Sequence, residues 1–319
     1  MKLFDGSARI GLGTAPLGNL FTAVSEEDAV ATVKAAWDEG WRYFDTAPHY
    51  GLGLAEERLG RTLRDKPRDS YVLSSKVGRL LVPSDSPAPD DQGYKVTTDL
   101  RREWDFSRDG VLRSIEDSLR RIGTDRLDVV FVHDPDDHYE EALRTAFPTL
   151  AALRDEGVIT AIGSGMNQSE MLTRFVRETD LDVIMLAGRY TVLDPDALDD
   201  VLPACLDNDV QVIAAGVFNS GLLSQARPAP DATFNYVPAP AALRQKAEQL
   251  ADVCESHGVT LPAVALQFPL MHPAVAGVVV GCRNAEEVRT NAALARTEVP
   301  AGVWSDLRSA GLLRADAPA

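Results

Sequence analysis

The stretch WRYFDTAPHYGLGLAEERLG, residues 41–60, joins a short apolar run to a segment of helical periodicity. The run WRYFDT predicts a buried strand, and residues 54–64 predict a helix. Seven more such runs alternate with helical segments along the chain: RIGLGT, SYVLSSK, RLDVVFVH, VITAIGS, LDVIMLAG, VQVIAAG and VAGVVVG. This alternation is typical of parallel α/β proteins. Without a linker or composition break, it favours a single (β/α)8 TIM barrel over residues 1–319, rather than two doubly wound domains.

The predicted helices lie between these runs and after the last one. Residues 107–123 illustrate them, because Ser107 can cap the amino end, apolar residues recur on one face, and Gly123 can end the helix. The predicted helices are 26–38, 54–64, 108–122, 140–156, 168–178, 195–208, 240–257 with 262–270, and 284–296.

Two segments, residues 79–104 and 218–240, are rich in Pro, Asp and Ser and are predicted to be long irregular loops. Both follow predicted strands, so both belong on the face of the barrel that carries active sites. Segments of this length are commonly lids or binding loops. The alternative is that they are surface insertions without function.

The charge balance excludes several classes of protein. Thirty-two Lys and Arg against 48 Asp and Glu give a net charge of −16, which argues against nucleic-acid binding. No apolar run is long enough to span a membrane or to serve as a secretory signal, so we expect a cytoplasmic protein. The spacing of Cys205, Cys254 and Cys282 indicates neither a disulfide framework nor a metal site.

Four polar residues lie where the predicted strands end. Asp45, Lys76 and His133 end the second, third and fourth strands, and Tyr50 follows the second. Taken singly, each has an ordinary structural explanation, such as a turn cap, a solvated lysine or a buried ring with a satisfied polar atom. Because carboxyl ends of barrel strands meet on one face, the four together predict a catalytic site.

Proton transfer by a phenol is the chemistry that suits this set. A tyrosine has an ordinary pKa of about 10, and an adjacent ammonium group favours the phenolate. We expect Lys76 to supply that charge, Asp45 to serve as the counter-ion of Lys76, and His133 to hold the reacting oxygen near Tyr50.

The chain resembles the aldo-keto reductases, single-barrel enzymes that use a nicotinamide cofactor. The resemblance rests on FDTAPHYG with GLAEERLG, on SSKVG and on DVVFVHDPD, and the family's Asp, Tyr, Lys and His tetrad falls on Asp45, Tyr50, Lys76 and His133. The stretches AIGSGMNQ, LAGRYTVLD, GVFNSGLL, NYVPAP and ALQFPLMHPAV resemble the branch that contains aldose 1-dehydrogenases, L-galactose dehydrogenase and pyridoxal 4-dehydrogenase.

The resemblance also implies which residues contact the cofactor. Besides Asp45, they are Gly13, Thr14, Gly165, Met166, Asn167, Phe218, Asn219, Ser220, Gly221, Leu222, Gly281, Arg283, Glu287 and Asn291. Many relatives have a nicotinamide-stacking Tyr where this chain has Ala215, which makes Phe218 a candidate for stacking.

The predicted cofactor residues between 281 and 291 bear on the choice between NAD and NADP. Where many NADP-dependent relatives hold the 2′-phosphate with a lysine and an arginine, this chain has Gly281 and Glu287. A carboxylate repels a phosphate and favours NAD, whereas Arg283 can hold a phosphate and favours NADP. Glu287 can equally be a glutamate in the first turn of a helix, where the helix dipole favours it.

Three residues are expected to border the substrate: His49, Trp104 and Asp134. The resemblance implies oxidation of the anomeric hydroxyl of a sugar such as L-fucose, D-arabinose or L-galactose to a lactone. Two alternatives remain: a pyridoxal dehydrogenase or general aldehyde reductase with the same site, and a nicotinamide-binding regulatory barrel.

Overall fold

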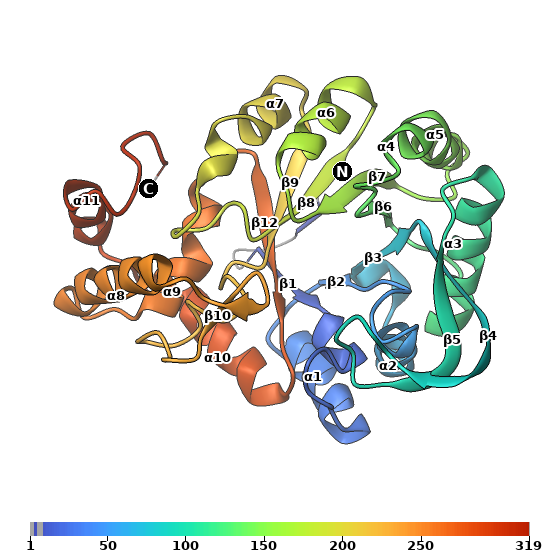
Figure 1. Ribbon diagram of the computed structural model, residues 1–319, viewed down its shortest axis with the longest axis horizontal. Coiled ribbons are helices and arrows are strands. Elements are labelled where there is room, and N and C mark those ends of the chain that lie inside the picture. Colours follow the sequence, from blue (N-terminus) through green and yellow to red (C-terminus); the bar gives the residue numbers. More distant parts are fainter. Residues whose placement is uncertain (1–2, 5–8, 319) are drawn as a thin grey trace.

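Eight parallel strands form a closed barrel in the computed structural model, which describes residues 3–4 and 9–318 (Figure 1). The eight predicted strands are confirmed, and their order around the barrel follows the chain. Their carboxyl ends therefore gather on one face, as the prediction of a common site requires. The barrel strands are β1 (Ile10–Gly13), β2 (Tyr43–Asp45), β3 (Val72–Val77), β6 (Val129–His133), β7 (Ala161–Met166), β8 (Val183–Ala187), β9 (Gln211–Ala215) and β12 (Val275–Gly281).

Helices surround the barrel (Figure 1). Ser107 accepts a hydrogen bond from the Gly110 backbone and Gly123 has a φ of 75°, which confirms both predicted ends of α3. The helix predicted over 195–208 is broken: a 3-10 turn (Asp196–Leu198) precedes α7. The α-helices are α1 (Glu26–Asp38), α2 (Leu54–Leu63), α3 (Arg108–Ile122), α4 (Tyr139–Glu141), α5 (Phe147–Asp155), α6 (Glu170–Glu178), α7 (Val201–Asp207), α8 (Ala241–Ser256), α9 (Leu261–Gln267), α10 (Ala285–Arg296) and α11 (Ala301–Ser309).

One helix contains a π turn. The segment Ala142–Ala146 joins α4 to α5, and Pro148 follows directly after the first residue of α5. A proline has no N–H to donate and its ring crowds the carbonyl four residues earlier, so a local widening of the helix relieves the clash.

The barrel interior is filled at the amino ends of the strands. Leu3 and Phe4 belong to a buried cluster with Tyr43 and Phe131, and the rings of Phe4 and Tyr43 stack with centroids 4.7 Å apart. A larger apolar layer fills the space between the barrel and the helices. The polar strand-end residues meet at the opposite, carboxyl end of the barrel.

The segment 79–104 is a β-hairpin, and the prediction of an irregular loop is wrong. Strands β4 (Arg79–Pro89) and β5 (Thr97–Trp104) pair antiparallel from Arg79 opposite Trp104 to Pro89 opposite Thr97. Both strands are edges of a two-stranded ribbon, and a proline on an edge strand can turn its missing N–H away from the partner. Proline content therefore did not exclude strand structure here.

The segment 218–240 is also partly ordered as strands. Short strands β10 (Thr233–Phe234) and β11 (Val237–Pro238) pair antiparallel around Asn235 and Tyr236, whose φ angles are 50° and 65°. Two consecutive residues of positive φ define the turn that matches the twist of a tight hairpin. The Tyr236 ring lies 5.3 Å from that of Phe21, so this hairpin contacts the loop after β1.

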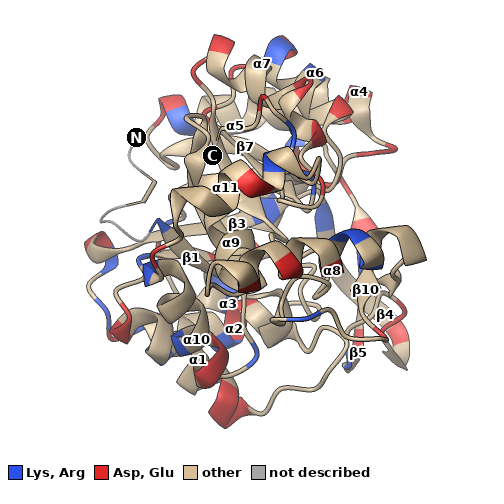
Figure 2. Ribbon diagram, turned by 90° about the vertical axis from the view of Figure 1, so that its left-hand side faces the viewer, with Lys and Arg blue, Asp and Glu red and all other residues tan. Residues whose placement is uncertain are grey.

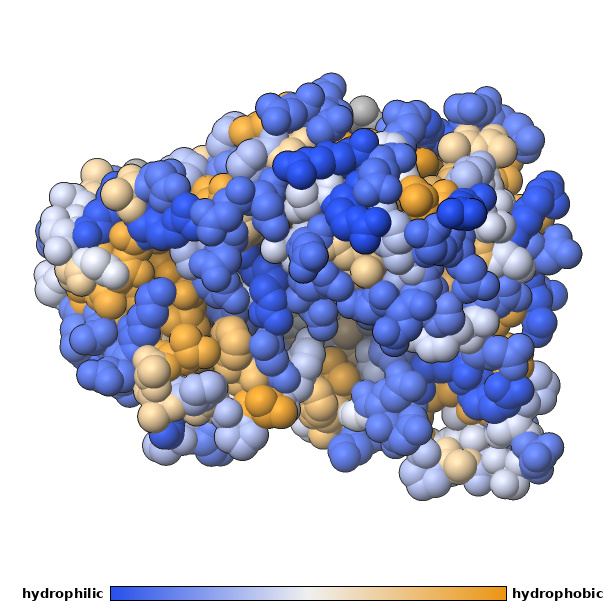
Figure 3. Space-filling model, turned by 45° about the horizontal axis from the view of Figure 1, so that its top comes forward, coloured by the Kyte–Doolittle hydropathy of each residue, from blue (hydrophilic) through white to orange (hydrophobic). Residues whose placement is uncertain are grey.

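Charged residues of both signs are interspersed over the helices (Figure 2), and hydrophilic residues cover most of the face in Figure 3, with apolar residues in separate patches. Among the residues that the structure describes, no helix has the length and apolarity needed to cross a bilayer.

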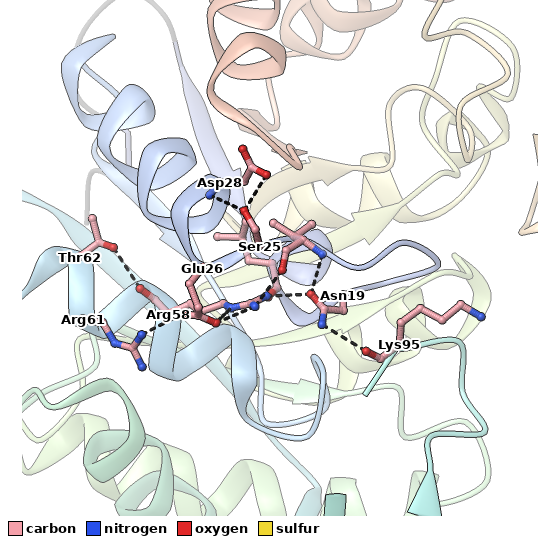
Figure 4. Close-up of polar contacts among 10 residues, drawn as sticks. Asn19, Ser25, Glu26, Asp28, Arg58, Arg61, Thr62 and Lys95 are labelled. Carbon is pink, nitrogen blue, oxygen red and sulfur yellow. Dashed lines mark hydrogen bonds and ion pairs between the residues drawn. The ribbon is translucent and has the colours of Figure 1, made fainter. Parts of the chain in front are cut away.

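A buried arginine ties together the loops on the barrel's open face (Figure 4). Arg58 of α2 donates to the carbonyls of Leu17 and Val24 at 2.6 and 2.9 Å, to Asn19 Oδ1 at 2.8 Å and to Glu26 at 2.7 Å. Asn19 in turn donates to the carbonyl of Lys95 in the β4–β5 connection at 3.2 Å. Asn19 joins the loop after β1 to the tip of the β4–β5 hairpin, and the Arg58 guanidinium holds Asn19 in place.

Replacing Arg58 with Met is expected to lower the free energy of unfolding by about 3 kcal/mol, because it leaves the carbonyls of Leu17 and Val24 buried without their donor. Urea denaturation measures the change. The control is Arg61→Met, which removes an exposed partner of the same Glu26 and should cost less than about 0.5 kcal/mol. Equal losses in the two variants would contradict a special role for Arg58.

Candidate functional site

A buried ion pair lies at the carboxyl ends of β2 and β3. Lys76 Nζ is 2.6 Å from Asp45 Oδ2 and donates to the Thr46 carbonyl at 2.9 Å, and the two side chains are 2% and 3% exposed. The second carboxylate oxygen of Asp45 accepts from Ser74 at 2.8 Å. Burial raises the pKa of Asp45 and lowers that of Lys76, while their mutual attraction opposes both shifts. Asp45 is placed as the counter-ion that sequence analysis assigned to Lys76.

Tyr50 lies beside this pair. Lys76 Nζ is 4.7 Å from the centroid of the Tyr50 ring, so the ammonium group lies over the ring face. Burial, followed by the Asp45 carboxylate, raises the pKa of Tyr50 well above its ordinary value. Burial sets the net direction of this pKa, and the expected effect of Lys76 on the phenol stays a prediction.

His133 faces Tyr50 from the end of β6. Their ring centroids are 5.9 Å apart with the planes nearly perpendicular, and His133 is 6% exposed. Burial lowers the pKa of His133 well below its ordinary value, and the cations Arg79 and Lys76 lower it further. The imidazole is consequently neutral near pH 7, which lets it donate one hydrogen bond and accept another.

His49 is part of the same aromatic cluster. Its ring lies 5.6 Å from that of His133 and 5.2 Å from that of Tyr94. Burial, with Arg79 as the next cause, lowers the pKa of His49 to about 2. Like His133, it is neutral, so the predicted substrate neighbour lies beside Tyr50 as an uncharged ring.

The β4–β5 hairpin contributes three residues that sequence analysis missed. Tyr94 is 4% exposed and its ring stacks at 6.4 Å from that of Tyr50, and Arg102 donates to the His49 carbonyl at 3.0 Å. Arg79 pairs with Asp134 at 2.7 Å. The sequence did contain a signal for them, because segment 79–104 carries aromatic and cationic residues and follows a barrel strand at the active face.

A cavity of about 300 Å³ has Asp134 in its wall, and Asp134 Oδ2 lies 3.5 Å from His133 Nε2. Trp104 and Asp134, two of the predicted substrate residues, both line it, together with Arg79 and the loop that follows β6. Asp134 has a φ of 42°, a strained conformation for a residue other than glycine, and strain of this kind clusters at functional sites. Asn167, predicted to contact the cofactor, also lines this cavity.

The predicted cofactor segments lie on the carboxyl face after β1, β7, β9 and β12. Gly13 pairs with Gly281 in the register of β1 and β12, and β9 is the next strand around the barrel. Gly165 of β7 lies next to the site, because a Cβ added there would be 3.8 Å from Lys76 Cε. The four segments therefore surround the mouth of the barrel.

Two polar atoms in these segments fit a bound dinucleotide. Thr14 Oγ1 and Asn219 Oδ1 are buried and have no hydrogen-bond partner among the described residues. Asn219 and Ser220 have φ angles of 46° and 57°, and Gly221 has a φ of 100°. A ligand rich in hydroxyls and phosphates can satisfy such orphaned atoms, so the residues present fit a nicotinamide cofactor.

Not every predicted cofactor residue offers its side chain. Met166 and Leu222 are 2% and 0% exposed and belong to the core between barrel and helices. Asn291 is 8% exposed and donates to Cys282 Sγ at 3.4 Å. These three side chains are therefore not free to contact a cofactor in this structure. Phe218 is half-buried, with its side chain packed against the same core.

Arg283 and Glu287 bind each other at the start of α10. Arg283 Nε and Nη2 donate to Glu287 Oε1 at 2.8 and 2.5 Å, and the Arg283 backbone N–H donates to Oε2 at 2.8 Å. The two side chains that sequence analysis set in opposition are thus one closed pair, and the carboxylate neutralises the guanidinium.

The comparisons with known proteins agree with this geometry. The chain belongs to the aldo/keto reductase family, whose sequence profile matches residues 9–311. It is 49% identical to D-threo-aldose 1-dehydrogenase from a Pseudomonas species, over 95% of this chain and 94% of the relative. It is 39% identical to pyridoxal 4-dehydrogenase from Microbacterium luteolum, over 95% and 94%, and 31% identical to L-galactose dehydrogenase from Arabidopsis thaliana, over 89% and 83%.

Solved structures support the fold. The glycerol dehydrogenase from Gluconobacter oxydans superimposes with a TM-score of 0.75 at 24% identity, over 94% of this chain and 90% of that one. Family membership makes this chain an NAD(P)-dependent oxidoreductase.

Proposed function

We propose that this chain is an aldose 1-dehydrogenase, which oxidises the anomeric hydroxyl of a free sugar to the lactone, and that NAD is its preferred cofactor. The observation that carries the proposal is the cluster at the barrel mouth: the buried Asp45–Lys76 pair, the Tyr50 phenol over it and the neutral His133 facing Tyr50. The 49% identity to a D-threo-aldose 1-dehydrogenase supports the sugar as substrate.

In this proposal, Tyr50 and His133 hold the reacting oxygen between them. His133 donates a hydrogen bond to the anomeric oxygen, and Tyr50 accepts its proton as the C–H bond breaks. A bound nicotinamide would supply the hydride acceptor, and Thr14 and Asn219 would hold it. Lys76 keeps a positive charge near the ring of Tyr50, and Asp45 makes burial of that charge tolerable.

Incubation with NAD or NADP and a panel of L-fucose, D-arabinose, L-galactose and pyridoxal tests the function through the absorbance of the reduced cofactor. Turnover of at least one sugar is expected. A 39% identical pyridoxal 4-dehydrogenase makes pyridoxal oxidation the second candidate. Activity on pyridoxal with none on any sugar would replace the first proposal with the second.

The direction of the Tyr50 shift predicts the pH dependence of oxidation. Because the pKa of Tyr50 is raised, the phenolate that accepts the proton is a minor species at neutrality and increases about tenfold per pH unit below that pKa. The kcat/KM for sugar oxidation should therefore rise from pH 7 to pH 9.5 without a plateau. No inflection from His133 is expected near pH 6.5, because its pKa is far lower. A plateau reached by pH 7 would mean that Tyr50 is already ionised.

The Arg283–Glu287 pair predicts the cofactor preference. Glu287 neutralises the cation that would otherwise receive a 2′-phosphate, so the ratio of kcat/KM for NAD over NADP should exceed about 10. Glu287→Ala frees Arg283 and should move this ratio toward NADP by roughly 10-fold to 100-fold. The control is Glu286→Ala, since Glu286 is an exposed neighbour on α10. If the ratio of kcat/KM for NAD over NADP were unchanged in Glu287→Ala, Glu287 would not determine the cofactor preference.

A further inference from the structure

The cavity beside His133 has an unusual balance of charge. Its wall contains three carboxylates, Asp134, Asp136 and Asp137, and a single arginine, Arg79. Its volume of about 300 Å³ is at the lower end of the range for small-molecule sites and suits a substrate of monosaccharide size. The wall meets the proposed site at Asp134, whose Oδ2 lies 3.5 Å from His133 Nε2, so its polar groups face a small molecule that is bound beside His133.

The single arginine of the wall, Arg79, already forms an ion pair. Arg79 binds Asp134 at 2.7 Å, and its guanidinium lies 4.5 Å from the centroid of the Trp104 ring. The Arg79 side chain is 12% exposed, so burial holds it in this position. Asp134 neutralises its charge, and an anionic group of a substrate would have to displace that carboxylate to bind there.

The other two carboxylates have no cationic partner among the described residues. Asp136 accepts from the neutral amide of Gln168 at 2.7 Å, and Asp137 is exposed. The neighbouring His138 ring binds a further carboxylate, Glu141, at 3.0 Å. The wall is consequently negative, and it offers acceptors that need hydrogen-bond donors on the ligand.

Trp104 supplies the apolar part of the wall. Its side chain remains 45% exposed, and its ring stacks on Phe106 with centroids 5.7 Å apart. A sugar ring matches this combination, because its C–H groups can pack on an aromatic side chain while its hydroxyls donate to carboxylates.

We propose that this cavity selects an uncharged polyhydroxylated substrate and rejects the same substrate when it carries a phosphate or a carboxylate away from the reacting carbon. The inference rests on the proposed function, in which Tyr50 and His133 hold the reacting oxygen. Asp136 and Asp137 are the specificity-determining residues, because their charge is not neutralised. Asp136 and Asp137 are both exposed, and an anionic substituent in the cavity meets their like charge at this solvated wall.

The test compares L-galactose with L-galactose 6-phosphate, which share the pyranose ring and the anomeric hydroxyl. In the wild-type protein at low salt, kcat/KM for the free sugar should exceed that for the phosphate by roughly 100-fold. The double variant Asp136→Asn with Asp137→Asn should reduce this ratio to roughly 10-fold or below. Salt at about 0.5 M should also lower the ratio of the wild-type protein, because it screens the carboxylates.

The matched control is the double variant Asp155→Asn with Glu298→Gln, which removes the same charge from exposed positions elsewhere on the barrel. Its ratio should equal that of the wild type. Equal turnover of the free and phosphorylated sugar by the wild type, or an unchanged ratio in the Asp136 and Asp137 variant, would overturn the proposal while leaving the oxidation of sugars intact.

Failure of the proposed function gives a different result. If no sugar reacts but pyridoxal does, the same comparison is made between pyridoxal and pyridoxal 5′-phosphate with the same variants. A strong preference for pyridoxal that weakens in the Asp136 and Asp137 variant supports charge selection, and equal rates on the two compounds overturn it.

Discussion

Tyr50→Phe is expected to lower kcat for sugar oxidation by at least about 10³-fold while leaving cofactor affinity within about threefold of the wild type. The substitution removes only the hydroxyl that accepts the proton, and general acid and base groups contribute roughly 10²-fold to 10⁴-fold to such reactions. The ring contacts with Tyr94 and His133 remain. Single-turnover kinetics measure the chemical step, and fluorescence titration measures cofactor binding.

The same variant should keep the fold. Because the Tyr50 hydroxyl has no hydrogen-bond partner among the described residues, its loss should change the free energy of unfolding by less than about 1 kcal/mol. The matched control is Tyr94→Phe, which removes the neighbouring phenol and should retain kcat within about tenfold. A Tyr50→Phe protein that turns over sugar at the wild-type rate would discard the mechanism, and a strong loss in Tyr94→Phe alone would transfer the role to Tyr94.

The barrel and the four strand-end residues were predictable because both depend on local pattern. A strand is signalled by its own apolar run, and the right-handed alternation of strands and helices places every carboxyl end on one face. Asp45, Lys76 and His133 therefore had to approach one another once β2, β3 and β6 were assigned. That register sets Asp45 opposite Ser74, and Lys76, two residues further along β3, lies 2.6 Å from Asp45.

The remaining features of the site depend on contacts that have no local signal. Arg79 meets Asp134 across 55 residues, and Tyr94 reaches His49 only because the hairpin folds over the barrel mouth. The pKa of Tyr50 depends on the sum of burial and several charges, and no single neighbour in the sequence reveals that sum. In contrast, the Arg283–Glu287 pair spans four residues at the start of a helix, and that spacing does predict contact.

Lys76→Met is expected to lower kcat by roughly 10²-fold to 10⁴-fold, because it removes the ammonium group that lies 4.7 Å from the centroid of the Tyr50 ring. It is also expected to lower the free energy of unfolding at pH 7 by about 3 kcal/mol, since it leaves a buried carboxylate without its partner. Loss of Lys76 raises the pKa of Asp45 further above its unfolded value, so this variant should be more stable in acid and lose stability as the pH rises.

The double variant Asp45→Asn with Lys76→Met separates the two effects of that substitution. With both charges removed, nothing buried is left ionised, so stability should return to within about 1.5 kcal/mol of the wild type. The kcat should stay low, because the ammonium group near the Tyr50 ring is still missing. Recovery of kcat together with stability would show that Lys76 acts only by neutralising Asp45, and the proposed electrostatic support of Tyr50 would then be wrong.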